Sequence, residues 1–372
     1  MISLFLPTLL SCATEPPEAA CDLAAPHLLV ATVDRRFSTG LLAAVDPATG
    51  CTTSLPAVSL GPDPLVRALP GAAGSPDRVA IVNRAGPRNL SVYDAGRYEV
   101  PAAQVGLDPG ANVHDVASVG DRLVTTAYDA GTIEVRAADG QLDHVIDLAP
   151  WADADGLAEP DRFVIGADGL QEGLQVVLQR MTRATDGWRA DEMGQLVAFD
   201  AESGETTLVA DLGPNPRVGP VSGGPVVVAS GLFGAPDGDL TVLGAPSPLV
   251  REQGLGVDIG HVAVLGDQAV VLGTSFDWEP VRSVLLCIDL RTGSVQEGDA
   301  SEAWWIDAVP VPERGAVFAA ARGFGDATER SGVFEVSAAT CSMEAVGDPL
   351  LLDPYALAWV GDGTMAAARM GW

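Results

Sequence analysis

The sequence predicts an all-β fold, a seven-bladed β-propeller with four-stranded antiparallel blades; eight blades are the alternative. Three observations support this prediction. The 372 residues include 42 glycines and 27 prolines, which interrupt the chain too often for long helices. Hydrophobic residues make up 47% of the chain and occur in short runs that end at turn signals. These runs recur with a period in the forties, which is typical of propeller blades.

The first strand of each predicted unit begins at a turn. The seven copies are "DPLVRALPG" (63–71), "NVHDVASVG" (112–120), "EPDRFVIGADG" (159–169), "NPRVGPVSGG" (215–224), "DIGHVAVLG" (258–266), "WWIDAVPVPERG" (304–315) and "DPYALAWVG" (353–361). Their starts are 43 to 56 residues apart. In a propeller these strands line the central channel, and a second short apolar strand follows each of them.

The third and fourth strands of a unit are joined by a turn with its own signature. It is clearest in "LLAAVDPATGCT" (41–52), "QLVAFDAESGET" (195–206) and "VLLCIDLRTGSV" (284–295). Asp46, Asp200 and Asp289 occupy the same place in these copies. An Asp there accepts hydrogen bonds from backbone amides two residues on, and the following Gly supplies a positive φ. Each unit therefore has about four short strands.

The two ends of the repeat predict a circular closure. The first unit begins with a second strand, Leu28–Ala31, and the chain ends just after a first strand, Tyr355–Val360. If these two strands share one blade, the ring closes and no sheet edge is left open. Residues 27–372 then form a single propeller domain. The remaining "TMAAARMGW" (364–372) is either an outer lap or a competing second strand, which keeps the eight-bladed alternative open.

The repeat resembles the broad superfamily of bacterial propellers with YVTN-type, lactonase-like and quinoprotein-like repeats, over residues 27–372. This resemblance implies the propeller fold and a ligand site on the propeller axis. The quinoprotein pattern has a Trp soon after the "TG" turn, where this chain has "CTTSL", "ETTLV" and "SVQEG". A quinone is therefore not expected, and no cofactor is predicted other than Ca²⁺.

The N-terminus predicts export. Residues 2–10 are apolar but too short to span a bilayer, and "LLSC" (9–12) resembles a bacterial lipobox. We therefore predict a lipoprotein signal peptide at 1–12, lipidation of Cys12 and a flexible tether at 13–26. An ordinary signal peptide and a buried N-terminal strand are the alternatives. Ala13 favours the outer membrane over retention at the inner one, so we expect a lipid-anchored protein of the cell envelope, at the outer membrane or in the periplasm.

Besides Cys12, the chain has four cysteines, an even number that permits disulfides in an exported protein. We predict a bridge between Cys21 and Cys51, which would join the tether to the first blade. Cys21–Cys341 is the alternative, because the first and last blades should touch. Cys287 lies in an apolar strand and is expected to be a small core residue.

The net charge is −29, from 50 acidic and 21 basic residues. Such a charge repels nucleic acid and anionic lipid surfaces, so we expect membrane contact only through the lipid anchor. We also expect a monomer.

A ring of oxygen-bearing side chains marks the predicted channel mouth. The six positions at the starts of first strands are Asp63, Asn112, Glu159, Asn215, Asp258 and Asp353. Carboxylate and amide oxygens suit Ca²⁺, so these are the candidate metal ligands. The alternative is that each residue caps the turn at its own strand. Further polar residues follow in the same strands: Arg67, His114, Asp115, Arg162, Arg217, His261, Asp307 and Tyr355.

Two further segments bear on ligand binding. The acidic loop "WADADGLAEPD" (151–161) does not fit an EF-hand, because that pattern would put Trp151 at the first ligand and Arg162 at the last. The insertion at 179–195 carries Met181, Trp188 and Met193; Trp188 is expected either to bind a partner or to cover the blade edge. Trp188, Trp304 and Tyr355 are the candidate partner-binding residues.

The chain has no G-x-S-x-G, H-E-x-x-H or Walker motif, and no G-x-G-x-x-G follows a strand. The sequence therefore favours a non-enzymatic module that binds or scaffolds a protein or glycan partner. The alternative is a Ca²⁺-dependent lactonase-like hydrolase with its site at the channel mouth.

Overall fold

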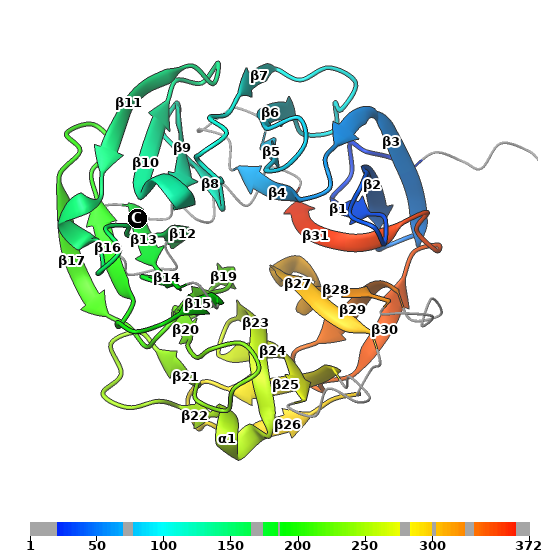
Figure 1. Cartoon of the computed structure of the whole chain (residues 1–372). Coiled ribbons are helices and arrows are strands. Elements are labelled where there is room, and N and C mark those ends of the chain that lie inside the picture. The colour runs from blue at the N-terminus through cyan, green and yellow to red at the C-terminus, as the bar shows by residue number, and fades with distance from the viewer. Residues whose placement is uncertain are drawn as a thin grey trace, which may run out of the picture.

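The computed structural model describes residues 21–69, 77–164, 174–184, 187–275, 283–299, 303–323 and 331–361. These residues form seven blades around a central axis (Figure 1), so the seven-bladed prediction is confirmed. The predicted signal segment with Cys12, residues 13–20 of the predicted tether and the final segment 364–372 lie outside the described residues. In the described part of the chain, no helix is long and apolar enough to cross a bilayer.

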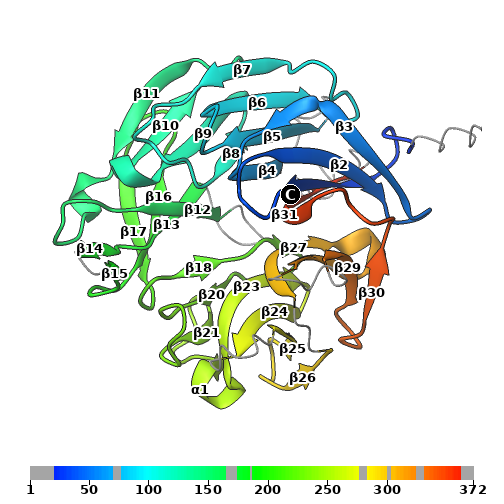
Figure 2. The ribbon, with the colours of Figure 1, turned by 45° about the vertical axis from the view of Figure 1, so that its right-hand side comes forward.

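Blade 1 closes the ring. From the axis outward it consists of β31 (Asp353–Val360), β1 (His27–Val33), β2 (Gly40–Asp46) and β3 (Cys51–Leu60). The last strand pairs antiparallel with the first, from Val33 opposite Asp353 to His27 opposite Val360. Figure 1 shows β31 beside β1, and in Figure 2 the red β31 lies close to the dark blue N-terminal strands, so the predicted circular closure is confirmed.

Blades 2 to 4 follow in chain order. Blade 2 contains β4 (Pro64–Leu69), β5 (Arg78–Asn83), β6 (Asn89–Asp94) and β7 (Ala103–Gly106). Blade 3 contains β8 (Val116–Val119), β9 (Arg122–Ala127), β10 (Thr132–Arg136) and β11 (Leu142–Asp147), with the short 3-10 helices η1 (Tyr128–Ala130) and η2 (Ala149–Trp151). Blade 4 contains β12 (Pro160–Val164), β13 (Leu174–Leu178), β16 (Gln195–Phe199) and β17 (Thr206–Asp211). The predicted insertion in blade 4 forms a hairpin of β14 (Thr182–Ala184) and β15 (Gly187–Arg189).

Blades 5 to 7 complete the ring. Blade 5 contains β18 (Arg217–Val218), β20 (Val227–Ala229), β21 (Asp239–Val242) and β22 (Val250–Arg251), followed by α1 (Glu252–Leu255). Blade 6 contains β23 (Val257–Leu265), β24 (Gln268–Ser275), β25 (Ser283–Asp289) and β26 (Val295–Glu297), with β19 (Val221–Ser222) at its inner edge. Blade 7 contains β27 (Trp304–Val311), η3 (Pro312–Arg314), β28 (Ala316–Arg322), β29 (Gly332–Ser337) and β30 (Met343–Val346).

The first strand predicted at 215–224 is in fact two short strands. β18 belongs to blade 5, whereas β19 pairs parallel with β23 of blade 6. Pro220 separates them and has no N–H to donate to a sheet. A Cβ on Gly219 would lie 1.5 Å from the carbonyl oxygen of Val262. The backbone therefore crosses to the next blade where no side chain fits.

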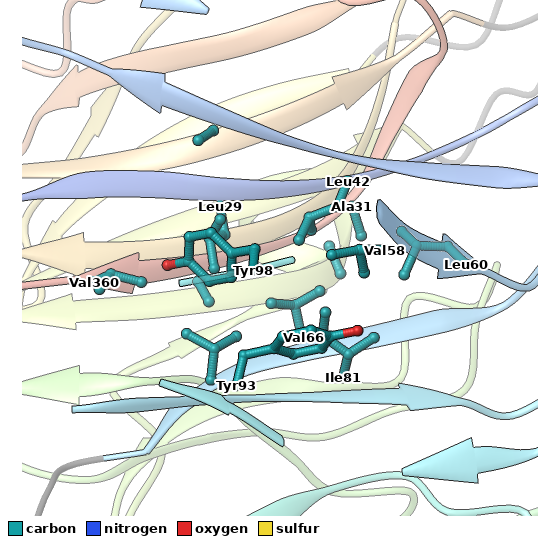
Figure 3. Packing of buried hydrophobic residues seen from close by; sticks show 14 residues of the cluster. Leu29, Ala31, Leu42, Val58, Leu60, Val66, Ile81, Tyr93, Tyr98 and Val360 are labelled. Atoms are coloured by element: carbon teal, nitrogen blue, oxygen red, sulfur yellow. The ribbon is translucent and has the colours of Figure 1, made fainter. Parts of the chain in front are cut away.

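The hydrophobic core lies between blades. Among the described residues, seven clusters of buried side chains each join two neighbouring blades, and one of them joins blade 7 to blade 1. In the cluster between blades 1 and 2, Leu29 and Val360 of blade 1 lie near Val66 and Ile81 of blade 2 (Figure 3). Apolar residues on both faces of a strand bury area that stabilises the ring at roughly 25 cal/mol per Å².

Two disulfides connect distant segments. Cys21 bonds to Cys51 at the start of β3, which fixes the described end of the predicted tether to blade 1. Cys287 of blade 6 bonds to Cys341 of blade 7. Cys287 is thus not an isolated core thiol, and Cys341 is not the partner of Cys21. Two disulfides indicate an oxidising compartment.

Candidate functional site at the propeller mouth

The innermost strands all begin on one side of the ring, which we call the mouth face. Antiparallel pairing places the ends of the second strands on the same side, as where Pro64 pairs with Asn83 and Pro160 with Leu178. Each loop after a second strand therefore lies at the mouth face as well. Function in a propeller concentrates in such loops, since the blades below hold them rigidly.

Several of the predicted ring residues shape the turns that start their strands. Asn112, Glu159 and Asn215 have φ of 46°, 42° and 46°, a left-handed backbone that Asn tolerates better than other residues. The side-chain amide of Asn215 donates to the carbonyl of Gly231 at 3.1 Å. These three positions are thus held by their own blades.

The remaining ring carboxylates have separate partners. Asp63 pairs with Arg84 and accepts a 2.7 Å hydrogen bond from the Tyr355 hydroxyl. Burial of the Tyr355 hydroxyl, reinforced by the nearby Asp63 carboxylate, raises the pKa of Tyr355 to about 12. Asp353 lies 3.7 Å from Arg35 and 3.9 Å from Arg322.

Asp258 is buried in blade 6, and one of its oxygens accepts a hydrogen bond from the backbone N–H of Gly234. Its burial raises its pKa above the usual range. Across the described residues, only Asp153, Asp155 and Glu159 have three ligand oxygens within 4.8 Å of one another. Of the four carboxylates among the candidate metal ligands, only Glu159 belongs to that group.

Charged side chains deeper in the innermost strands do converge on the axis. Arg67 of blade 2 donates to Asp115 of blade 3 at 2.6 Å, and Asp115 also accepts from the backbone N–H of Phe163 in blade 4. Burial disfavours the Arg67 charge, but Asp115, Asp307 and Asp161 outweigh it and raise the pKa of Arg67. The Arg67 guanidinium therefore interacts electrostatically with carboxylates from blades 3, 4 and 7.

Two histidines adjoin this set. His114 Nδ1 lies 2.8 Å from an oxygen of Asp161, and the His114 ring stacks on Tyr128 with centroids 4.0 Å apart. Burial lowers the pKa of His261, and Asp307 only partly offsets that effect. We call Arg67, His114, Asp115, Asp161, Arg217, His261 and Asp307 the axial cluster.

The sequence singled out six members of the axial cluster but missed Asp161. It named the adjacent Arg162, which is half-buried. Asp161 stands two residues after the start of its unit, as His114 does in blade 3 and Arg217 in blade 5. Alignment by offset within the strand would have identified it.

Exposed aromatic side chains gather on the mouth face. Among described residues, the exposed Phe and Trp side chains are Phe37, Trp188 and Phe233, with 50%, 43% and 51% of their surface accessible. Phe37 and Phe233 lie in loops that follow second strands, and Trp188 lies on β15 of the hairpin inserted after the second strand of blade 4. Most of the exposed aliphatic residues, such as Val145, lie instead on outer strands.

Each exposed aromatic residue lies beside a second aromatic residue near the axis. Phe37 contacts Tyr355 with ring centroids 6.1 Å apart, and Phe233 contacts Trp304 at 6.3 Å. Trp188 lies 6.3 Å from Tyr128. The three candidate partner-binding residues, Trp188, Trp304 and Tyr355, therefore each take part in an aromatic pair at the mouth face. The sequence missed Phe37 and Phe233, whose signal is an aromatic residue within a loop.

Arginines flank two of these rings. The Arg183 guanidinium lies 4.9 Å from the Trp188 ring centroid, and that of Arg322 lies 4.0 Å from the Phe37 ring centroid. Trp188 stands on the exposed strand β15, so it does not bury itself against the blade edge. The mouth face thus presents aromatic rings with cations beside them.

A hollow of about 550 Å³ lies elsewhere, on blade 1 between β2, β3 and the segment 348–351. Its lining is mostly threonine, leucine and backbone, and it contains none of the axial cluster. The mouth face therefore remains the better candidate site.

Comparison with known proteins supports the fold. No family model matches the chain, and no curated protein matches it. A 6-phosphogluconolactonase-like protein from Bacteroides uniformis has 16% identity and a TM-score of 0.53, covering 90% of this chain and 99% of its own. A similar protein from Bacteroides fragilis has 16% identity and a TM-score of 0.52, covering 92% and 100%. The acylaminoacyl peptidase of Pyrococcus horikoshii has 10% identity and a TM-score of 0.53, covering 87% and 51%. The chain is thus structurally similar to lactonase-like propellers, and at these identities the likeness concerns the fold alone.

Proposed function

We propose that this protein is an exported binding module whose mouth face engages a protein partner. The observation that carries the proposal is the placement of every exposed Phe and Trp of the described residues on that face. Trp, Tyr and Arg dominate the residues that contribute most to protein–protein affinity. Here Trp188 is paired with Arg183, and Phe37 with Arg322.

The charge of the chain indicates which partner surface fits. A net charge of −29 attracts basic surfaces over long range and accelerates their association. We therefore propose a partner with a basic surface and an apolar patch that covers the aromatic residues. A glycan is the alternative partner. Lipidation at Cys12, outside the described residues, would hold the module at the envelope.

Site-specific cross-linking tests this proposal. A photoreactive phenylalanine analogue replaces Trp188 or Phe233 in producing cells, and Val145 on β11 is the matched exposed control. We expect one protein to cross-link at both mouth-face positions and not at Val145. Equal cross-linking at all three positions contradicts the proposal, and so does its absence at both mouth-face positions. Once the partner is identified, Trp188→Ala should weaken its binding by about 2 kcal/mol or more.

The axial cluster supports a second candidate, a hydrolase that acts on a lactone. His114 next to Asp161 is a possible general base, and Arg67 is suited to an anionic substrate. In the Ca²⁺-dependent form of this alternative, carboxylate and amide oxygens of the predicted ring would hold the ion. Sugar lactones assayed with wild type and His114→Gln test it: turnover that the substitution abolishes supports an enzyme, and equal rates contradict it.

A further inference from the structure

The acidic loop before β12 brings three carboxylates together. Asp153, Asp155 and Glu159 each offer an oxygen within 4.8 Å of the other two. None of the three forms an ion pair with an arginine in the described part of the chain. The adjacent Arg180 pairs instead with Glu192. The described residues therefore place no arginine in an ion pair with this group, and the Arg183 charge acts on Asp155 only at longer range.

One carboxylate of the group is incompletely bonded although it is buried. Glu159 has no accessible surface, and its Oε2 accepts a hydrogen bond from the backbone N–H of Met181 at 3.1 Å. Its Oε1 is buried and has no hydrogen-bond partner. A buried polar atom without a partner costs free energy, and far more so when the group is ionised.

The same three carboxylates connect the loop to the inserted hairpin. Besides the Met181 bond, Asp153 accepts a hydrogen bond from the Thr182 hydroxyl at 3.2 Å. Asp155 accepts one from the backbone N–H of Arg183 at 3.0 Å. Three consecutive hairpin residues thus contact the three carboxylates, and Arg183 pairs with Trp188 across the hairpin.

We propose that Asp153, Asp155 and Glu159 bind one Ca²⁺ ion, which fastens the β14–β15 hairpin to blade 4. Oxygens bound to one Ca²⁺ lie about 2.3–2.6 Å from it, so two of them are at most about 5 Å apart. The measured spacing meets that limit. The group contains oxygens only, without Cys or His, and this favours Ca²⁺ over Zn²⁺. The ion supplies the missing partner of Glu159 Oε1.

The ion site stands on its own geometry, whereas any effect on partner binding rests on the proposed function. A Ca²⁺ ion would hold residues 181–183 to the loop and so restrict the position of Trp188 on the opposite strand. The EF-hand pattern missed the site because the ligands do not follow its spacing. They span only seven residues, and the hairpin completes their surroundings.

Calorimetric titration of CaCl₂ into the chelator-treated full chain tests the proposal. We expect one ion per chain, and slower amide hydrogen exchange at residues 181–189 once Ca²⁺ is bound. Asp155→Asn changes an exposed side chain and Glu159→Gln keeps the buried shape, and each should weaken Ca²⁺ binding at least tenfold. Asp139→Asn is the matched control, since Asp139 is also exposed and accepts a backbone hydrogen bond two residues on.

No heat at millimolar Ca²⁺ overturns the proposal, and so does unchanged affinity in both Asp155→Asn and Glu159→Gln. Ion binding that leaves exchange in the hairpin unaltered overturns the fastening role. Circular dichroism confirms that each variant is folded before it is titrated. Partner cross-linking is a separate measurement, so its failure contradicts the proposed function without bearing on the ion.

Discussion

Glu252 should make the stability of the propeller fall as the pH rises from about 4.5 to 7. The side chain is fully buried at the start of α1, where its two oxygens accept 2.8 Å hydrogen bonds from the N–H groups of Gly238 and Ile259. Burial raises the pKa of Glu252 from 4.5 to about 7. The hydrogen bonds and Arg217 oppose that rise, and Asp258 adds to it.

The sign of the effect follows from proton binding. Between pH 4.5 and 7 the folded state binds the Glu252 proton more tightly than the unfolded state does. The free energy of unfolding therefore contains a contribution that is fully present below pH 4.5 and is lost as the pH rises through 7. At about 1.4 kcal/mol per pKa unit, the contribution is at most about 3.4 kcal/mol.

Urea unfolding of wild type and Glu252→Gln, at pH values from 4.5 to 8, measures this contribution. The Gln side chain carries no charge and loses one hydrogen bond, which lowers stability by an amount that does not depend on pH. We expect the free energy of unfolding of wild type, relative to that of the variant, to fall by up to about 3.4 kcal/mol from pH 4.5 to 8. Glu344→Gln, at an exposed position, controls for net charge. Parallel curves for wild type and Glu252→Gln would refute the reasoning.

Three further predictions concern the fold and its export. Replacing Cys287 and Cys341 by Ala should cost about 4 kcal/mol of stability in chemical unfolding, since the bridge closes a 54-residue loop; an unchanged midpoint would contradict this. Gly219→Ala should prevent folding or lower the melting temperature sharply, because its Cβ would meet a carbonyl oxygen of β23, whereas Gly106→Ala has open space around it; equal melting temperatures would show that the crossing is not tight. Cys12→Ser should move the protein to the soluble fraction, and unchanged fractionation together with an unmodified Cys12 by mass spectrometry would exclude the lipid anchor.

The architecture could be predicted because its signals are local and repeated. Asp46 and Asp289 accept hydrogen bonds from the amides of Ala48 and Arg291, two residues on, at 2.8 and 2.9 Å. The glycine that ends each of these turns has positive φ, as Gly50 does at 74°. Such turns need only neighbouring residues, so one copy identifies the others. The circular closure then follows from which strands are left over at the two ends.

The site could be predicted only in part, because its geometry depends on how blades sit against each other. Oxygen-bearing residues at the strand starts share a position in the repeat, yet Asp63 bonds to Arg84 and Tyr355 while Asn215 bonds to Gly231. The periodic pattern gives the location of such a residue along its strand. It does not give the partner that the adjacent loop provides.

The surroundings of His27 could not be predicted for the same reason, because its partner lies in another blade. From its position directly after the predicted tether, His27 would be expected to be exposed to solvent. It is buried at 1% accessibility, and its Nε2 lies 2.7 Å from the hydroxyl of Tyr98 in blade 2. Burial lowers the pKa of His27 and raises that of Tyr98 to about 12. The Cys21–Cys51 disulfide holds the segment between Cys21 and His27 against blade 1. The contact of His27 with Tyr98 extends that attachment to blade 2.

The hydrophobic cores lie between the blades and not in the mouth-face loops, and this affects how the mouth face can bind a partner. Seven interblade cores and the β1–β31 pairing keep the ring rigid, so loop changes at the mouth face cost the fold little. The insertion in blade 4 uses that freedom. It adds a hairpin that carries Trp188, and polar contacts connect the start of this hairpin to the acidic loop. A cation at that loop would therefore act on the position of an exposed aromatic residue without disturbing any interblade core.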